Sequence, residues 1–142
     1  MDERILYAQD DGRVVIIIPA SNSGLTIDEI AEKDVPEGKT FEIVDVSDVP
    51  SDRLFRNAWE HDTTASTMKV KVNMTKAKAI AHDFRRGRRS SEFMSVDGDN
   101  QYSALTAEGE VLRQPIRDRY ALMQTNIDAA KTPAAIKKAL GL

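Results

Sequence analysis

The chain has 142 residues, of which 41% are hydrophobic and 30% are charged, a composition typical of a folded globular protein. It contains no cysteine, so disulfide bonds, thiolate metal sites and cysteine nucleophiles are excluded. Its longest apolar run, Val14–Ala20, is interrupted by Pro19 and is far shorter than the roughly 20 residues that a membrane-spanning helix needs. The acidic start Met1-Asp2-Glu3 is unlike the basic start of a signal peptide, so we expect a soluble protein synthesised in the cytoplasm.

Charged residues are distributed unevenly along the chain. Residues 1–62 hold 15 acidic and 6 basic residues, a net charge of −9, whereas residues 63–142 hold 8 acidic and 14 basic residues, a net charge of +6. So large a difference between two halves is typical of two modules, or of a face that meets a charged partner. We therefore expect an acidic αβ module over residues 1–62 and a basic, mainly helical module over residues 63–142.

The first module is predicted to open with a β-hairpin. Residues 5–9 and 13–18 are β-rich runs, and Asp10-Asp11-Gly12 between them supplies the Asp-Gly pair that tight hairpin turns favour. The run Val14–Ile18 is apolar on both faces, which is typical of a strand in the middle of a sheet or beneath a helix.

A helix, a third strand and a second short helix are expected next. Thr26 and Glu29 form a capping-box pattern, which starts a helix that closes before Pro36. The apolar residues within 41–46 predict a strand. Ser51-Asp52 is a second cap signal, and it predicts a short helix that carries four apolar residues, Leu54, Phe55, Ala58 and Trp59.

The second module is predicted to begin with a strand and a helix. Residues 61–67 are polar and Thr-rich, which is typical of a linker, and residues 68–73 alternate apolar and polar side chains at the period of a strand. From Met74 the period changes to that of a helix, whose apolar stripe comprises Ala77, Ile80, Ala81 and Phe84. We expect a turn at residues 97–100.

A long helix and a short terminal helix complete the prediction. Apolar spacing after Thr106 predicts the long helix, in which Pro115 either causes a kink or marks a later start. Thr132-Pro133 is a cap followed by proline at the first helical position, so a short helix is expected over 134–140, ended by Gly141. The expected fold class is α+β: an N-terminal αβ module with a β-hairpin, then a strand and a C-terminal module made of a helical hairpin and a short terminal helix.

Residues with catalytic or metal-binding chemistry are sparse. His61 lies in the expected linker, and His82 lies off the apolar stripe, where a solvated histidine is the simplest interpretation. Asp97 and Asp99 begin a pattern similar to a calcium loop, but the sixth position of that loop is Tyr102 instead of glycine. No glycine-rich phosphate loop is present. We expect no catalytic site, no cofactor and no metal, and keep an uncharacterised enzyme as a third hypothesis.

Arg85, Arg86, Arg88 and Arg89 form the sharpest local charge signal. Four arginines within five residues suit contacts to phosphate groups. No aromatic residues that stack on bases are interleaved with them, and the net charge of the chain is −3, which is unlike a dedicated nucleic-acid binder. Pairing with the acidic module or with an acidic partner is therefore favoured, and nucleic-acid binding by this segment is the alternative.

Phe55, Arg56 and Trp59 are the candidates for an interface anchor. On the predicted helix Phe55 and Trp59 lie four residues apart on one face, with Arg56 beside them. Trp, Phe and Arg dominate the residues that hold protein interfaces together. The alternative interpretation is that the cluster is the core of a small domain, and the sequence favours it because this is the only tryptophan of the chain.

Several stretches of the chain resemble a group of small proteins encoded among the tail genes of tailed bacteriophages. In the first half these are 31–38, 43–45 and 49–59; in the second half they are 76–83, 85–89, Glu92-Phe93 before Asp97, 113–118, 127–130, Thr132-Pro133 and Ile136-Lys137. Arg113, Arg117 and Asp118 are also loosely similar to a segment at the helical end of tail-fibre assembly chaperones. The resemblance extends from about residue 24 onward, and Pro115 departs from it.

The resemblance implies a phage tail or virion accessory protein. Its motifs are structural and bring no active-site residues with them. We expect a non-enzymatic protein that binds tail or tail-fibre subunits, or a second copy of itself, and that is located in the virion tail or in the host cytoplasm during assembly. A small nucleic-acid-binding phage protein that uses Arg85–Arg89 is the alternative.

Overall fold

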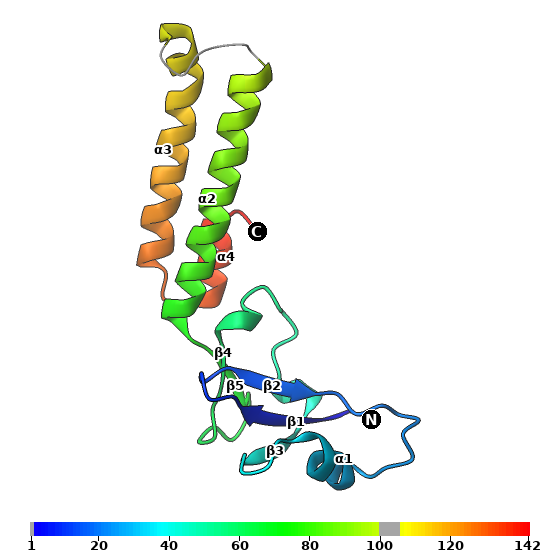
Figure 1. The fold of residues 1–142 in the computed structure, drawn as a ribbon. Helices are drawn as coiled ribbons and strands as arrows, with labels where there is room; N and C mark the ends of the chain where they lie inside the picture. Colours follow the sequence, from blue (N-terminus) through cyan, green and yellow to red (C-terminus); the bar gives the residue numbers. More distant parts are fainter. Residues whose placement is uncertain (1, 100–105) are drawn as a thin grey trace. The chain divides into compact units, whose positions relative to one another are not determined.

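The computed structural model describes residues 2–99 and 106–142, which form two compact units that divide after Asn73 (Figure 1). We call them the N-terminal unit, up to Asn73, and the helical unit, from Met74. The division does not coincide with the change of charge at residue 62. It lies later because residues 70–72 form a strand that pairs with residues 59–61.

The N-terminal unit contains a three-stranded antiparallel sheet. Its strands are β1 (Glu3–Ala8), β2 (Val14–Ile17) and β3 (Phe41–Asp45), in the order β2-β1-β3. The predicted hairpin of β1 and β2 is confirmed, and Gly12 in its turn has a positive φ of 81°, which glycine adopts without steric cost.

Helix α1 (Ile27–Asp34) covers one side of this sheet. The predicted capping box is present: the backbone N–H of Glu29 donates to Thr26 Oγ1 at 3.3 Å, and the backbone N–H of Thr26 donates to Glu29 Oε2 at 2.7 Å. Ile30 and Ala31 are buried in a cluster with Ile5 of β1. The local signal for a helix and the burial of its apolar side therefore agree.

Strand β2 lies at the edge of the sheet, and not in the middle, which was the first interpretation of its apolar composition. Both of its faces are nevertheless covered. Val14 and Ile16 pack against a buried cluster that includes Trp59, and Ile17 packs against the cluster that contains α1. The strand is apolar on both faces because two separate clusters, on opposite sides of the sheet, need its side chains.

The short helix predicted after Ser51-Asp52 is absent. A 3₁₀ turn at Arg56–Ala58 leads directly into strand β4 (Trp59–His61), which pairs antiparallel with β5 (Val70–Val72). The segment expected to be a linker is thus the end of β4 and the connection of a second hairpin. Extended backbone at Trp59 places its ring in the cluster of Leu6, Val44 and Val70, and this burial outweighs the local cap signal.

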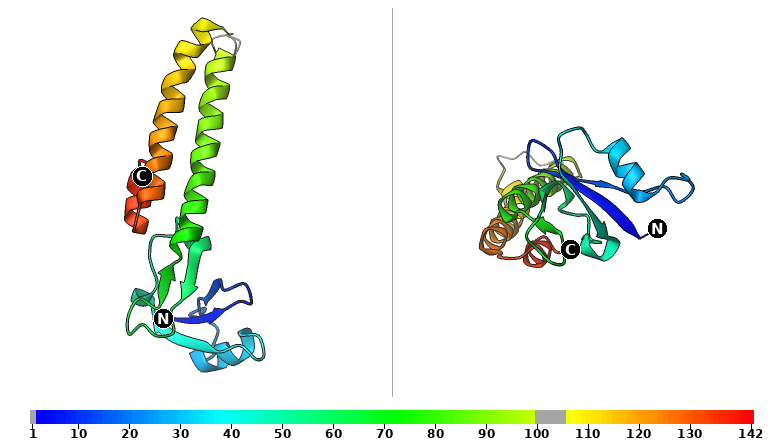
Figure 2. Two further views of the ribbon diagram at one scale, coloured as in Figure 1. Left: turned by 90° about the vertical axis from the view of Figure 1, so that its left-hand side faces the viewer. Right: turned by 90° about the horizontal axis from the view of Figure 1, so that it is seen from below.

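The helical unit consists of α2 (Met74–Asp99), α3 (Ala107–Ala129) and α4 (Pro133–Ala139). Helices α2 and α3 form the predicted hairpin, and α4 lies beside the end that holds the first turns of α2 (Figures 1 and 2). The turn expected at 97–100 is wrong for residues 97–99, where α2 continues; position 100 lies outside the described residues.

Helix α3 continues through Pro115. It begins at the Thr106 cap, whose Oγ1 accepts from the backbone N–H of Gly109 at 3.1 Å, so the alternative of a later start at Pro115 is wrong. Thr132, Pro133 and Gly141 bound α4 as predicted, and Gly141 has a φ of 73°. The α+β class is confirmed, and none of the helices in the described ranges has the length and apolarity to cross a bilayer.

Candidate functional site

The predicted interface anchor is divided between core and surface. Phe55 is 3% exposed and Trp59 is 1% exposed, whereas Arg56 between them is exposed. The guanidinium of Arg53 lies 5.8 Å from the centre of the Trp59 ring, a contact that the helical interpretation of this segment concealed. Phe55 and Trp59 therefore contribute to the core of the N-terminal unit and offer no surface to a partner.

The four arginines of α2 do not form one cationic surface. Arg85 is only 6% exposed, Arg86 forms an ion pair with Asp83, and Arg88 donates to the Leu140 carbonyl at 2.7 Å. Arg89 is exposed. The four arginines therefore have different surroundings, because side chains at successive positions of a helix point about 100° apart.

Arg85 is a buried cation between the helices. Burial lowers the pKa of its guanidinium, repulsion from Arg89 and Arg86 lowers it further, and Asp128 on α3 acts in the opposite direction. Its Nε is buried and has no hydrogen-bond partner among the described residues. Burial of this charge therefore lowers the stability of the hairpin, and the guanidinium is not accessible to phosphate groups.

Asp128 joins the first half of α2 to the end of α3. His82 Nε2 lies 2.8 Å from Asp128 Oδ1, and Lys78 Nζ donates to the Asp128 carbonyl at 2.7 Å. The side chain of His82 is 18% exposed, so the interpretation of a solvated histidine is wrong. Its partner lies on a different helix, which a search for neighbours along the sequence does not find.

A second polar cluster, in the N-terminal unit, connects strand β3 with the β4–β5 hairpin. Glu42 on β3 accepts from Lys69 Nζ at 2.6 Å and lies 2.9 Å from His61 Nε2. Lys69 and, to a smaller extent, His61 lower the pKa of the Glu42 carboxyl. The sequence analysis missed this cluster because its members come from three segments. Because Glu42 contacts both Lys69 and His61, the cluster links the β4–β5 hairpin to β3.

The distal part of the hairpin, toward Asp97, is also held by polar contacts. Glu92 accepts from the Tyr120 hydroxyl at 2.5 Å and forms an ion pair with Arg119. Arg113 donates to both carboxylate oxygens of Asp97 at 2.6 Å, and its guanidinium lies 4.4 Å from the centre of the Phe93 ring. These contacts add to the packing of α3, on which Ile116 and Tyr120 are buried at this level of the hairpin.

Neither cluster offers a metal site. Over residues 2–99 and 106–142, no group of three or more His, Asp or Glu residues is placed to hold an ion. Asp97 of the calcium-like pattern lies on α2 and is paired with Arg113, while Tyr102 of that pattern lies outside the described residues. The carboxylate of Asp97 is thus engaged by Arg113.

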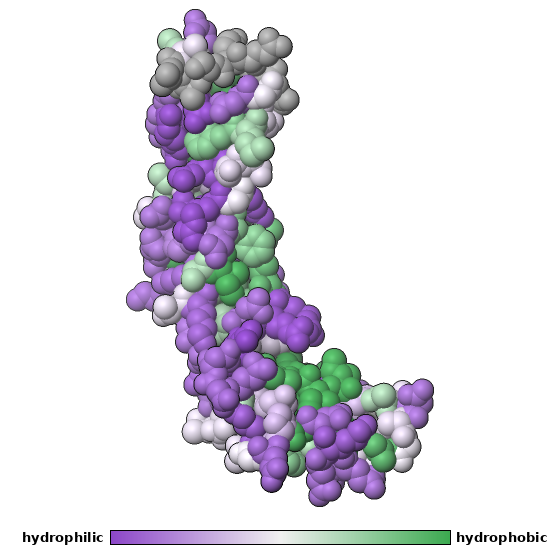
Figure 3. All heavy atoms as spheres, viewed as in Figure 1, coloured by the Kyte–Doolittle hydropathy of each residue, from purple (hydrophilic) through white to green (hydrophobic). Residues whose placement is uncertain are grey.

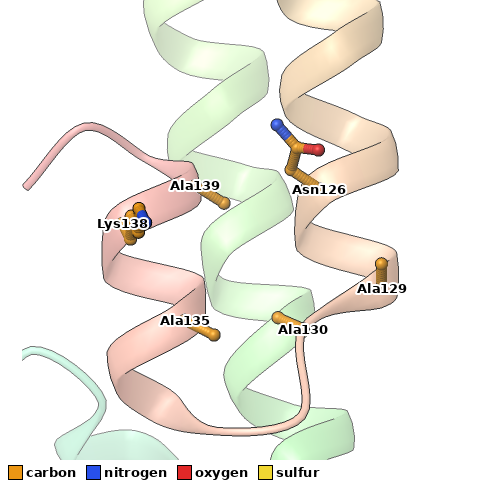
Figure 4. A pocket seen from close by; sticks show the side chains of 6 residues that line it. All are labelled: Asn126, Ala129, Ala130, Ala135, Lys138 and Ala139. Carbon is orange, nitrogen blue, oxygen red and sulfur yellow. The ribbon is translucent and has the colours of Figure 1, made fainter.

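The surface of the units has several hollows, among them two that bear on function. One, of about 400 Å³, lies between the end of α3 and α4 and is walled mainly by alanine methyl groups (Figure 4). The other, of about 190 Å³, lies beside β2 in the N-terminal unit, where Figure 3 shows hydrophobic residues gathered. We call it the β2 surface; its main lining residues are Ile16, Ile18, Val46, Val49, Arg4 and Arg53.

The β2 surface has the features of a protein contact. Ile18 is 60% exposed and Val46 is 40% exposed, and strand β2 is an edge of its sheet. The two arginines on its rim carry charges opposite to most of the N-terminal unit. An apolar centre with a charged rim at a sheet edge suits an extended segment of another protein.

No protein-family model, curated protein or solved structure matches this chain.

Proposed function

We propose that the protein is a non-enzymatic, bacteriophage tail-associated structural or assembly protein that binds tail or tail-fibre subunits. The resemblance of residues from about 24 onward to small phage tail proteins supports this proposal. The polar side chains singled out in the sequence are paired within the units, as His61, His82 and Asp97 illustrate.

The β2 surface is the observation that carries the proposal. Exposed Ile18 directly follows edge strand β2, which has no further hydrogen-bonded strand on its outer side within the described residues, and exposed Val46 directly follows β3 on the other side of β1. A partner segment that adds to the β2 edge gains main-chain hydrogen bonds and covers the side chain of Ile18. Arg4 and Arg53 favour a segment that carries carboxylates.

The alternative, nucleic-acid binding by Arg85–Arg89, has less geometric support. Arg85 is buried and Arg88 is bonded to the end of α4, which leaves Arg86 and Arg89 as the exposed guanidinium groups of the run. Two exposed arginines predict weak binding with a shallow dependence on salt. Gel shifts of the wild type and of the Arg86→Ala and Arg89→Ala double variant at low and moderate salt test this alternative, and absence of a shift for the wild type at low salt removes it.

Mass spectrometry of purified virions and co-purification with co-expressed tail and tail-fibre subunits of the same phage test the proposed function. We expect one of these subunits to bind the wild type and Leu25→Asp, an exposed loop control with the same charge change. Binding should fall at least tenfold for Ile18→Asp. If no tail subunit binds and virions lack the protein, or if both variants bind equally well, the proposal is wrong.

A further inference from the structure

All four arginines of the N-terminal unit lie beside one strand. The unit holds 15 acidic and 8 basic residues, a net charge of −7, and four of its basic residues are arginines. Arg4 and Arg53 line the β2 surface, and Arg13 and Arg56 line a neighbouring hollow of about 210 Å³ at the start of β2. No aspartate or glutamate is among the described residues that line these two hollows. Positive charge is therefore concentrated along β2 on a unit that is otherwise strongly acidic.

Two of these arginines have no carboxylate partner within the described part of the chain. Arg53 and Arg56 are both exposed, and neither forms an ion pair there. The guanidinium of Arg53 lies 5.8 Å from the centre of the Trp59 ring, a contact that positions its charge without neutralising it. Arg13, by contrast, forms an ion pair with a neighbouring aspartate. Because the unit has an excess of carboxylates, arginines that none of them engages favour an anionic group supplied by a partner.

The hydrogen bonds of β2 show which of its backbone groups face away from the sheet. The backbone N–H of Gln9 donates to the Arg13 carbonyl at 2.8 Å, so residue 13 is a hydrogen-bonded position of the antiparallel pair with β1. Such positions alternate along a strand, so Val14, Ile16 and Ile18 direct their N–H and C=O groups away from β1. Within the described residues, no backbone hydrogen bond reaches these outward groups. They are available to a partner strand.

The edge also limits the length and the side-chain order of such a strand. Pro19 follows directly and has no N–H group, so pairing ends at Ile18. The five residues 14–18 span roughly 16 Å, with one hollow at their start and the β2 surface at their end. Side chains two positions apart share a face of a strand. A segment with a carboxylate two positions before and after an apolar residue thus presents all three groups to the same face.

A peptide suits this edge better than a nucleic acid, which is the other common polyanion. The outward N–H and C=O groups of β2 match the main chain of a peptide. Proteins that bind single strands of nucleic acid stack bases on exposed aromatic rings, whereas the Trp59 ring beside Arg53 is only 1% exposed. The net charge of −7 on the unit also repels a long chain of phosphates.

We propose that the β2 edge binds an extended acidic segment of a partner protein, in which carboxylates flank an apolar residue at a spacing of two positions. The outward backbone groups of β2 pair with the main chain, the β2 surface receives the apolar side chain, and Arg53 and Arg56 bind the carboxylates. This inference rests on the proposed function for the place of docking and adds the chemistry of the segment that docks.

Fluorescence anisotropy of the full chain with labelled peptides tests the charge requirement. We expect Ser-Glu-Thr-Val-Thr-Glu-Ser to bind about tenfold more tightly at low salt than the same peptide with glutamine for glutamate, and high salt to remove this preference. Arg56→Gln and Arg53→Gln should each abolish most of it. Lys33→Gln, which makes the same charge change at an exposed position of α1, is the matched control and should keep it. Unchanged emission of Trp59 shows that the variants remain folded.

Amide hydrogen exchange locates the bound peptide. The N–H groups of Val14, Ile16 and Ile18 should exchange more slowly in the complex, whereas those of Val15 and Ile17, already bonded to β1, should change less. No binding of the glutamate peptide, equal affinity for the two peptides, or unchanged exchange at the three outward amides overturns the proposal. Equal effects of Arg56→Gln and Lys33→Gln, or tighter binding of oligothymidylate than of the glutamate peptide, also overturn it.

The failure of this proposal is distinguishable from the failure of the proposed function. A tail subunit that depends on Ile18 but binds equally well to Arg53→Gln and Arg56→Gln leaves the proposed function intact and overturns the acidic segment. Binding of the glutamate peptide with the expected preference, while no tail subunit binds, supports the acidic segment and overturns the proposed function.

Discussion

The hydroxyl of Tyr120 on α3 donates a hydrogen bond of 2.5 Å to Glu92 Oε1 on α2. Tyr120 is 2% exposed, while the guanidinium of Arg119 forms an ion pair with the same carboxylate. One acidic side chain thus ties two neighbours of α3 to α2 at a level where α2 has no buried apolar residue. The distal hairpin therefore depends on polar contacts that respond to pH.

The helical unit is expected to lose stability in alkaline solution. Burial and the bond to Glu92 raise the pKa of Tyr120 above its ordinary value of 10.0. The folded state therefore holds this proton more tightly, so the contribution is complete below pH 10 and is lost as the pH rises through the folded pKa. Tyr120→Phe should flatten this loss at high pH and cost about 1 kcal/mol near neutrality. Helical circular dichroism during urea unfolding at pH 7 to 11 measures it; an unchanged alkaline slope contradicts it.

The N-terminal unit is expected to lose stability in acid. Lys69 and His61 lower the pKa of Glu42 below its ordinary value of 4.5. The contribution of this carboxylate is therefore complete above pH 4.5 and is lost as the pH falls through the folded pKa. Glu42→Gln should make the unit less sensitive to acid below pH 4.5. Fluorescence of Trp59, the only tryptophan, reports this unit alone, and Asp28→Asn on the exposed side of α1 serves as the control.

Replacement of the buried cation should stabilise the helical unit. Arg85→Met keeps the length and apolar stem of the side chain and removes a charge whose Nε has no partner in the described part of the chain. We expect a gain of about 1 kcal/mol in the free energy of unfolding. Lys131→Met, at an exposed position after α3, should leave it unchanged. Urea unfolding followed by circular dichroism distinguishes the two, and a destabilised Arg85→Met would show that the charge is compensated.

Trp59 should behave as a core residue. Trp59→Ala removes a side chain that is 1% exposed and packs in the cluster with Leu6 and Val44, so a loss of about 4 kcal/mol is expected. Phe41→Ala, at a residue that is 42% exposed, should cost much less. Thermal unfolding of the N-terminal unit by near-ultraviolet circular dichroism or NMR measures both. Equal effects of the two variants would contradict the assignment of Trp59 to the core.

Local signals in the sequence predicted most elements of the fold. Thr26 with Glu29, Thr132 with Pro133 and the turn glycine Gly12 act on backbone groups within three or four residues, so the sequence contains everything these contacts need. The α+β class was predicted correctly because these local signals identify most of its helices and strands. Apolar periodicity likewise identified α2 and α3, although the end of α2 was missed because the Asp-Gly-Asp stretch is typical of a turn.

The candidate site was much less accessible to sequence reasoning. Arg85, Arg86, Arg88 and Arg89 are alike in the sequence, and only the positions of Leu140 and Asp83 around them separate a buried cation, a carbonyl donor and an ion pair. The pairing of Glu42 with His61 and Lys69 was invisible because the sequence separation of its members carries no information on their distance.

The sequence by itself determined the helix caps, the hairpin turn, the periodicity of α2 and the opposite charges of the two halves of the chain. Tertiary structure alone decided that Trp59 lies on a strand, that β2 is an edge and that Arg85 is buried. The physical reason is range: a cap or a turn is satisfied by adjacent backbone, whereas burial depends on residues that the fold brings together from far along the chain.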